Sequence, residues 1–158
     1  MAKNKVTGLG SEVMSFLWKM INNILPTESR LARILPNSVE FCKFCPDQLS
    51  ADLPHCLIKC VQTKEVGSWL VSVIRQQDDT VNENKLVKLD FICEENLEFP
   101  LVWLIGQTLH HLWENRVSGK VANMVMTRTM LEHKIALLRE TRFSIACETL
   151  ERIISNVN

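Results

Sequence analysis

Glycine and proline are scarce in this chain, with five of each among 158 residues, and tyrosine is absent altogether. Such a composition excludes a low-complexity chain, and apolar residues make up 46% of the sequence, enough for a core. The 18 Lys and Arg residues balance the 18 Asp and Glu residues, so no overall basic charge indicates a nucleic-acid binder. No apolar run approaches the roughly 18 residues of a membrane-spanning helix. We therefore expect a globular chain of about one domain, with no membrane partner.

A recognisable export signal is also missing. Lys3 and Lys5 could begin one, but Ser11, Glu12 and Lys19 interrupt the apolar stretch that a signal peptide needs. We therefore expect an intracellular location, nuclear or cytoplasmic, where the six cysteines stay reduced. Clustered Cys and His residues in a reducing compartment indicate metal binding more than disulfides.

Catalytic motifs are missing as well. The sequence has no phosphate-binding glycine loop, no serine nucleophile elbow and no cysteine–histidine protease pattern. Its one Asp-Asp pair, Asp78-Asp79, falls in a polar stretch without a flanking strand pattern, which favours a solvated loop. His110 and Glu114 have the i,i+4 spacing of an ordinary helix pair. We expect no enzyme activity and no small-molecule substrate.

Apolar residues recur mostly at helical spacing, which predicts a mainly α fold. Helices are expected over about 11–25, 28–35, 54–76, 100–116 and 121–138, and a last helical segment, 141–155, either continues the preceding helix or follows it. Ser11 and Thr27 are the expected N-caps of the first two. Residues 77–86 are typical of a loop, and 87–92 of a short strand or an extended tether. This divides the chain into a zinc-binding helical region (11–76), an acidic linker (77–99) and a helical tail (100–156).

Large or sulfur-containing side chains on the apolar stripes complete the predicted core. Cys93 and Cys147 each lie in an apolar setting, far in sequence from the other cysteines, and are expected to be buried. The four tryptophans are expected in the core rather than as base-stacking platforms: Trp18, Trp69, Trp103 and Trp113.

The most specific pattern present is Cys42-x2-Cys45-x9-His55-x4-Cys60, which places four potential ligands within 19 residues. Zinc prefers thiolate and imidazole ligands in a tetrahedron, and a Cys-x2-Cys turn can place two sulfurs on one ion. His55 and Cys60 can converge if the first turn of their helix is irregular. The adjacent Cys56 is the alternative third ligand. The pattern predicts a structural Zn²⁺ site, a CCHC zinc knuckle in the N-terminal third, because four protein ligands leave no position for water.

Basic residues surround this pattern, and Arg30, Arg33, Lys43 and Lys59 are the candidate nucleic-acid contacts. Such groups could contact phosphates while a metal fixes their spacing. Their small number predicts weak, sequence-independent binding of RNA or DNA. An ordinary solvated surface is the competing interpretation, and the chain would then be a protein-interaction or structural helical module.

The stretch from Phe16 to Cys60 resembles the zinc-binding region that follows the polymerase domain in reverse transcriptases of non-LTR retrotransposons. The shared features are Trp18, the turn Leu25-Pro26-Thr27, the Arg30-Leu31 pair with Arg33, the Cys-x2-Cys pair and His55-x4-Cys60. Residues 102–116 and 134–143 resemble the tail of such elements more weakly, so the resemblance extends from about residue 14 to 154. Pro54 departs from the family, which often has an acidic residue before the histidine.

This resemblance implies a particular ligand set and a non-catalytic role. The family's His-x4-Cys favours His55 over Cys56 as the third ligand. The metal-binding aspartates of a polymerase are absent, because Asp78-Asp79 has no hairpin pattern around it. The resemblance therefore implies an accessory module derived from a reverse transcriptase without its polymerase domain, either the tail of a larger element or an inactive remnant.

Overall fold

The computed structural model describes residues 8–89, 98–141 and 143–156, and the chain is mainly helical, as the sequence predicts. No β-strand forms in these ranges, where an isolated antiparallel bridge joins Phe41 to Ser50. None of the helices described there has the length and apolar character needed to cross a bilayer. In chain order the helices are α2 (Ser11–Ile21), α3 (Glu28–Ala32), the π-helix η1 (His55–Lys59), α4 (Lys64–Arg75), α5 (Glu83–Lys88), α6 (Phe99–Val117), α7 (Met124–Arg139) and α8 (Ala146–Ser155).

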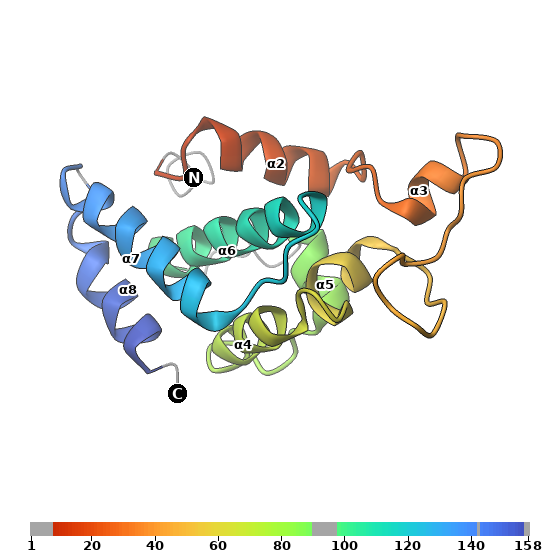
Figure 1. Ribbon diagram of the computed structural model, residues 1–158. Helices are drawn as coiled ribbons and strands as arrows, with labels where there is room; N and C mark the ends of the chain where they lie inside the picture. The colour runs from red at the N-terminus through yellow and green to blue at the C-terminus, as the bar shows by residue number, and fades with distance from the viewer. Residues whose placement is uncertain (1–7, 90–97, 142, 157–158) are drawn as a thin grey trace.

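The long helix α6 lies at the centre of the molecule, between α2 and α4 (Figure 1). Every residue from Leu101 to Leu109 is buried, so α6 is covered around its whole circumference over this length. A helix that is apolar on all sides can only be stable when other elements surround it. Pro100 suits its first turn, because that turn needs no backbone N–H donor. The helix therefore forms the core on which the other helices pack.

Helix α2 packs on α6 through one apolar face that includes Val13, Leu17 and Met20. The close approach depends on Gly106 of α6, because a Cβ atom there would lie 2.8 Å from the Leu9 side chain. The Gln107 side chain also donates a hydrogen bond to the Leu9 carbonyl (3.1 Å). Gly10, in the left-handed region at φ 80°, is the N-cap of α2 and makes no side-chain cap, so the expected Ser11 cap is wrong.

Helices α7 and α8 pack side by side at the opposite end of the molecule from α3 (Figure 1). They are separate helices, because α7 ends at Arg139 and α8 begins at Ala146. The Thr141 hydroxyl donates to the Leu138 carbonyl (2.6 Å), which satisfies one of the acceptors left at the end of α7. An ion pair between Arg139 and Glu151 then bridges the two helices.

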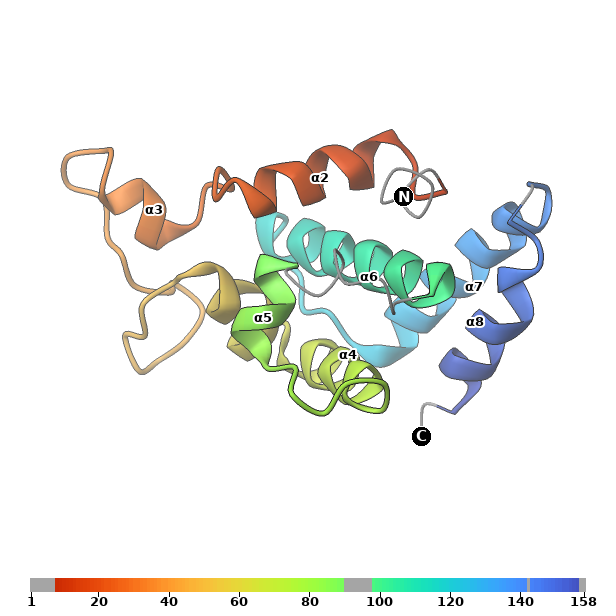
Figure 2. The ribbon, with the colours of Figure 1, turned by 180° about the vertical axis from the view of Figure 1, so that it is seen from behind.

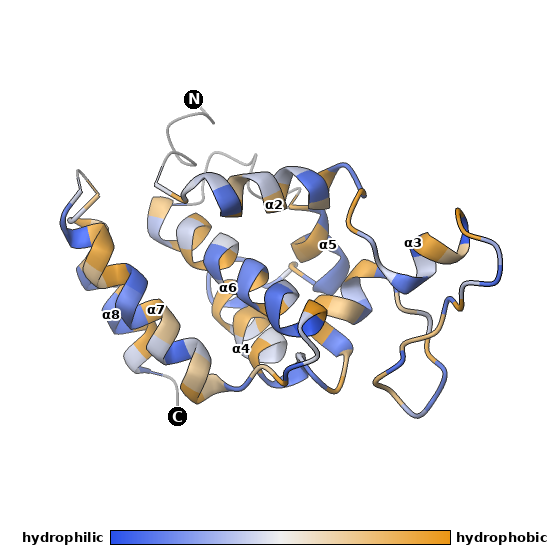
Figure 3. Cartoon of the chain, turned by 45° about the horizontal axis from the view of Figure 1, so that its top comes forward, coloured by the Kyte–Doolittle hydropathy of each residue, from blue (hydrophilic) through white to orange (hydrophobic). Residues whose placement is uncertain are grey.

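Residues 28–53 form an arm that projects from the helical body and carries α3 (Figures 1 and 2). Thr27 caps α3 as predicted, since its hydroxyl accepts a hydrogen bond from the Arg30 N–H. The helix is only five residues long, three residues shorter than expected. Several large apolar side chains of the arm are exposed: Ile34, Leu35, Val39, Phe41 and Leu49. Figure 3 shows hydrophobic and hydrophilic stretches alternating along the chain that forms the arm.

The loop predicted over residues 77–86 forms only at 77–82, and the strand or tether predicted from residue 87 is wrong where the chain is described. The polar stretch expected as a loop contains the start of α5, which Asn82 caps by accepting from the Lys85 N–H. Val87 and Lys88 belong to that helix rather than to a strand or tether, and Leu89 ends it in the left-handed conformation at φ 56°. Leu86 and Val87 are buried, so tertiary packing stabilises this helix although its polar composition does not predict one. Residues 90–92 lie outside the described ranges, as does Cys93.

The tryptophan predictions hold only in part. Trp103 is 2% exposed and belongs to the core, and Trp69 and Trp113 pack against that core while partly exposed. Trp18 is 59% exposed and lies on the outer face of α2, so its assignment to the core is wrong. It follows the buried pair Phe16 and Leu17 in sequence, and the helical turn directs it to the other side.

The packing of α4 against η1 suggests a test at Gly67. A Cβ atom at this position would lie 2.7 Å from the Ile58 Cα and 3.0 Å from the Ile58 carbonyl oxygen, which are backbone atoms that cannot move alone. We expect Gly67→Val to lower the free energy of unfolding by about 2 kcal/mol or more, as overpacking does. Chemical denaturation measures this. Ser68→Val introduces the same side chain at the next, exposed position of α4 and should change stability far less. Equal effects of the two substitutions would contradict the close approach.

Candidate metal centre

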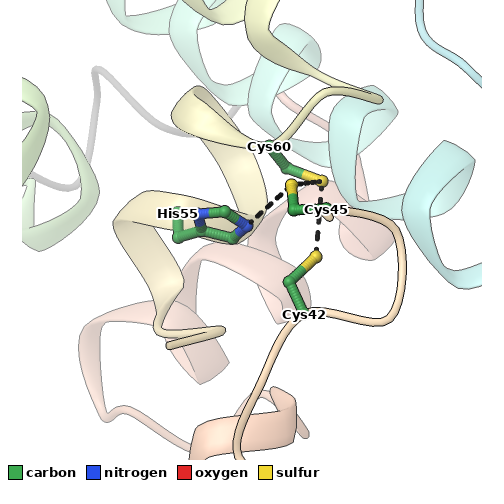
Figure 4. A group of neighbouring side chains, drawn as sticks. All are labelled: Cys42, Cys45, His55 and Cys60. Atoms are coloured by element: carbon green, nitrogen blue, oxygen red, sulfur yellow. Dashed lines mark hydrogen bonds between the residues drawn. The ribbon is translucent and has the colours of Figure 1, made fainter. Parts of the chain in front are cut away.

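The four predicted ligands lie together, with their ligand atoms all within 4.8 Å of one another (Figure 4). The Sγ atoms of Cys42 and Cys45 lie 3.7 and 3.8 Å from the Sγ of Cys60, and Cys45 Sγ lies 3.5 Å from His55 Nε2. The sulfurs are too far apart for a disulfide, in which they are about 2.05 Å apart. Four donors converging on one point make this cluster a possible metal site.

A short loop positions Cys42 and Cys45. The Cys42 N–H donates to the Leu49 carbonyl (2.9 Å) and the Ala51 N–H donates to the Glu40 carbonyl (2.9 Å). These two hydrogen bonds close the chain from 42 to 49 into a hairpin-like loop beside the Phe41–Ser50 bridge. The loop turns both sulfurs toward η1 (Figure 4).

The irregular turn that the sequence required between His55 and Cys60 is a π-helix. The Cys60 N–H donates to the His55 carbonyl (2.8 Å), the i→i+5 bond of a π turn. This wider turn brings residues five apart onto one side of the helix. Cys60 is then extended at ψ 143°, so the expected continuous helix over 54–76 is wrong and α4 begins anew at Lys64. At this break the buried Thr63 hydroxyl donates a hydrogen bond to the Cys56 carbonyl (3.1 Å).

Cys56 lies outside the four-ligand cluster. It is fully buried, and its thiol donates to the Ala51 carbonyl (3.4 Å). Burial raises the pKa of this thiol well above its ordinary value, only partly opposed by the charge of Arg116. The geometry therefore favours His55 over Cys56 as the third ligand.

Arg116 joins the cluster to the centre of the fold. This last-turn residue of α6 is 4% exposed, and its Nη1 lies 3.3 Å from Cys60 Sγ and 3.6 Å from Cys42 Sγ. Its Nη2 donates to both carboxylate oxygens of Glu28 at 2.8 Å, and the guanidinium lies over the Phe44 ring at 5.2 Å. Burial lowers the pKa of Arg116, but its bonds to Glu28 and the sulfurs outweigh this and raise it. Arg116 therefore stays charged and offsets the charge of neighbouring thiolates.

Arg116 and Glu28 are functional residues that sequence analysis missed. Glu28 is indistinguishable from an ordinary first-turn acid of α3, and Arg116 from a favourable cation at the end of α6. The two are 88 residues apart, and only the packing of the arm on α6 pairs them.

The cysteines of the cluster differ in proton affinity. Burial raises the pKa of Cys42, but hydrogen bonds from the Phe44 backbone, His55, Arg116 and Cys60 outweigh it and lower the pKa to about 6. Burial, with the hydrogen bond and the charge of Cys42, raises the pKa of Cys60 to about 12. Zinc binds cysteine as the thiolate, so metal binding must displace the protons that these cysteines carry. Metal binding should therefore release a proton and strengthen as the pH rises.

The four predicted nucleic-acid contacts do not all line the same pocket. Arg30 and Arg33 line one pocket beside α3, and neither Lys43 nor Lys59 is among the residues that line it. Lys43 lies over the Phe44 ring at 4.9 Å within the ligand loop, and Lys59 is exposed on η1. The two lysines are each adjacent in sequence to a cysteine of the cluster, and the two arginines lie in the arm that carries Cys42 and Cys45.

The remaining candidates behave as structural groups. His110 lies 3.6 Å from Glu114 and makes an edge contact with the Phe16 ring. Asp78 accepts hydrogen bonds from the backbone and side chain of Thr80 in a turn, and Cys147 is buried as predicted. No second group of three or more Cys, His, Asp or Glu ligands occurs in the parts of the chain that the structure describes.

Comparisons of the chain with models of protein families, with curated proteins and with solved structures find no match. The resemblance to reverse-transcriptase zinc-binding regions therefore remains a prediction. The geometry of the four ligands is independent of that resemblance.

The contacts of Arg116 suggest a matched pair of substitutions. Arg116→Met keeps much of the side-chain volume but leaves Glu28 and the sulfurs without their cation. We expect metal affinity to fall about 10- to 100-fold, as for other groups that orient metal ligands. Competition with a chromogenic chelator measures this. Arg128→Met removes an arginine whose Glu132 partner is on the same exposed helix face, and it should leave metal affinity unchanged. Unaltered affinity in Arg116→Met would refute the role of its charge.

Proposed function

We propose that Cys42, Cys45, His55 and Cys60 bind one Zn²⁺ ion. The observation that carries this proposal is the set of distances between ligand atoms. Zinc–sulfur bonds of about 2.3 Å and a zinc–nitrogen bond of about 2.0–2.1 Å, arranged in a tetrahedron, require edges of about 3.8 Å between sulfurs and about 3.5 Å between sulfur and nitrogen. Three of the six edges fit these values, with sulfur–sulfur distances of 3.7 and 3.8 Å and a sulfur–nitrogen distance of 3.5 Å, and the other three pairs lie within 4.8 Å.

The role of the ion would be structural rather than catalytic. Four protein ligands complete the zinc tetrahedron, and a catalytic site keeps one position for water or substrate. Cys42, His55 and Cys60 are buried and Cys45 is partly buried, so water has little access. The ion would hold the arm against η1, where the small cluster around Ala51 and Cys56 has little apolar area of its own.

The module's proposed role is non-catalytic contact with nucleic acid. Arg30, Arg33, Lys43 and Lys59 form no ion pair with an acidic residue of the described ranges, so their charges remain available for phosphates. The resemblance to accessory regions of retrotransposon reverse transcriptases supports the same role. Since these cations are few and do not all line one pocket, binding should be weak and independent of sequence.

A protein partner is the second candidate, and the apolar arm favours it. Ile34 is 60% exposed, Val39 64% and Leu49 48%, and all three belong to the arm formed by residues 28–53. Exposed apolar side chains gathered in one segment are typical of interaction surfaces. In that case the zinc would shape a docking arm and the basic residues would be ordinary solvated groups.

Substitution of the ligands tests the zinc proposal. We expect one zinc per chain in the reduced protein, and loss of stoichiometric zinc in Cys42→Ser, Cys45→Ser and Cys60→Ser, because a serine hydroxyl is a poor zinc ligand at neutral pH. Elemental analysis of purified protein measures the metal content. Cys56→Ser is the matched control and should retain one zinc, since Cys56 bonds to Ala51 instead. Loss of zinc from Cys56→Ser alone, with His55→Ala unaffected, would assign the third position to Cys56.

Charge reversal tests the nucleic-acid proposal. With four phosphate contacts, the log–log slope of affinity against salt should be on the order of −2 to −4, from about −0.9 per contact on duplex DNA and −0.7 on single strands. Arg30→Glu with Arg33→Glu should weaken binding to all sequences alike and leave zinc content unchanged. Fluorescence anisotropy at two salt concentrations measures both effects.

The matched control is Arg128→Glu with Arg152→Glu, an equal charge change at exposed positions of α7 and α8, at the opposite end of the molecule from α3 (Figure 1). It should bind nearly as the parent does. If both double variants lose the same affinity, only net charge matters and the basic arm has no special role. If the parent protein does not bind nucleic acid even at low salt, a protein partner becomes the favoured function.

A further inference from the structure

A pocket of about 460 Å³ lies where the C-terminal end of α2, α3, the residues before η1 and α5 meet. Figure 2 shows α5 close to the end of α2, with the arm beyond them. The volume falls in the range of about 300–1,000 Å³ that small-ligand sites occupy. One wall belongs to the arm that the metal ligands hold, and the other belongs to the helical body.

The polar side of this pocket is basic. Arg30 of α3 and Arg33, the residue that ends this helix, are three positions apart and therefore lie on the same face, and Lys88 of α5 is the third cation that lines the pocket. Asp52 is its one acidic residue, and its Oδ1 already accepts a hydrogen bond from the His55 N–H (2.9 Å). None of the three cations has an ion-pair partner among the described residues. The pocket thus carries an excess of positive charge.

One of these cations is held in place before any ligand arrives. Arg30 Nη1 donates a hydrogen bond to the Asn23 carbonyl, which orients the guanidinium. Asn23 is itself in the left-handed region at φ 52°, where the chain turns after α2. A planar, pre-oriented guanidinium suits a phosphate group better than a flexible cation does.

The lining also has an apolar part, which includes the exposed Ile21 and the buried Met20 and Val87. Leu53 and Pro54 are partly buried and also line it. The ligand that fits must therefore combine a flat or apolar part with an anionic group within reach of the three cations. Asn84 and Ser29 add donors and acceptors between these two parts.

We propose that this pocket binds one nucleotide, with its phosphate on Arg30, Arg33 and Lys88 and its base against Ile21, Leu53 and Pro54. A single-stranded nucleic acid is the source that the proposed function implies, and the inference rests on that function. Bases of a duplex are stacked and paired, so entry would require unstacking, whereas an unpaired base is free to enter. The protein should therefore prefer single strands to duplexes.

Substitution of Lys88 distinguishes binding in this pocket from general phosphate binding around the metal cluster, because Lys88 lines the pocket but lies far in sequence from the proposed zinc ligands. Lys88→Gln should weaken binding of a single-stranded ten-nucleotide DNA roughly two- to fivefold, the usual worth of one exposed charge contact. Lys85→Gln, on the same helix but not part of the lining, is the matched control and should bind as the parent does. Fluorescence anisotropy at low salt measures both, and zinc content is determined for each.

Two further ligands test the base and the strand. An abasic strand of equal length and charge should bind the parent protein at least about fivefold more weakly, because the base is missing. A duplex of the same sequence should also bind more weakly per site. If duplex, abasic and ordinary strands bind alike, and Lys88→Gln binds as the parent does, the pocket inference is overturned while the nucleic-acid proposal stands.

A nucleoside monophosphate distinguishes a strand from a free nucleotide. Its binding should shift the Arg30 and Arg33 Nε signals in ¹H–¹⁵N spectra of the parent and shift them less in Lys88→Gln. Such shifts without binding of any strand would overturn the nucleic-acid proposal and assign the pocket to a free nucleotide. No shift and no strand binding would overturn both.

Discussion

The buried contact of Arg116 with Glu28 and the sulfurs of Cys42 and Cys60 is the interaction on which the arrangement of the molecule depends. Helix α6 is the core of the fold, and its last turn carries a cation that reaches the metal cluster. The proposed zinc ion, with three thiolates and a neutral imidazole, would have a net charge of about −1, and Arg116 would offset it. Glu28 in turn pairs with Arg116, so the ion, the arm and the core would form one charge-coupled unit.

This unit explains why the arm can be so poor in core residues. Its buried cluster consists of Cys42, Ala51, Cys56 and Cys60, a set with little apolar surface. Burial of the Arg116–Glu28 pair is costly unless every donor and acceptor is satisfied. Here the guanidinium reaches two carboxylate oxygens, two sulfurs and the face of Phe44, so the pair is well compensated. Metal and ion pair together would replace the apolar core that the arm does not have.

The sequence predicts those parts of the structure that depend on local pattern. The helix around Pro100 and the ligand spacing of residues 42–60 are readable because each follows from neighbouring residues. The break at Cys60 is not, since the residues from Pro54 to Gln76 have a continuous helical stripe and no Gly or Pro lies between Cys60 and Lys64 to mark it. Helix α5 and the Arg116–Glu28 pair depend on contacts between distant segments, which no local pattern records. Trp18 shows the reverse case, an apolar residue on a helical stripe that the fold leaves outside.

The break after η1 separates the geometry of the candidate ligands from the packing of α4. The π turn sets the direction of His55 and Cys60, and Cys60 is then extended, so the rotation of that turn is not carried along a continuous helix. Helix α4 begins at Lys64, and its buried face, with Leu70 and Ile74, is set by its own packing on α6 and on η1. The ligand turn and the core helix are therefore joined by side-by-side packing, at the close approach of Gly67 to Ile58, rather than by a shared helical phase.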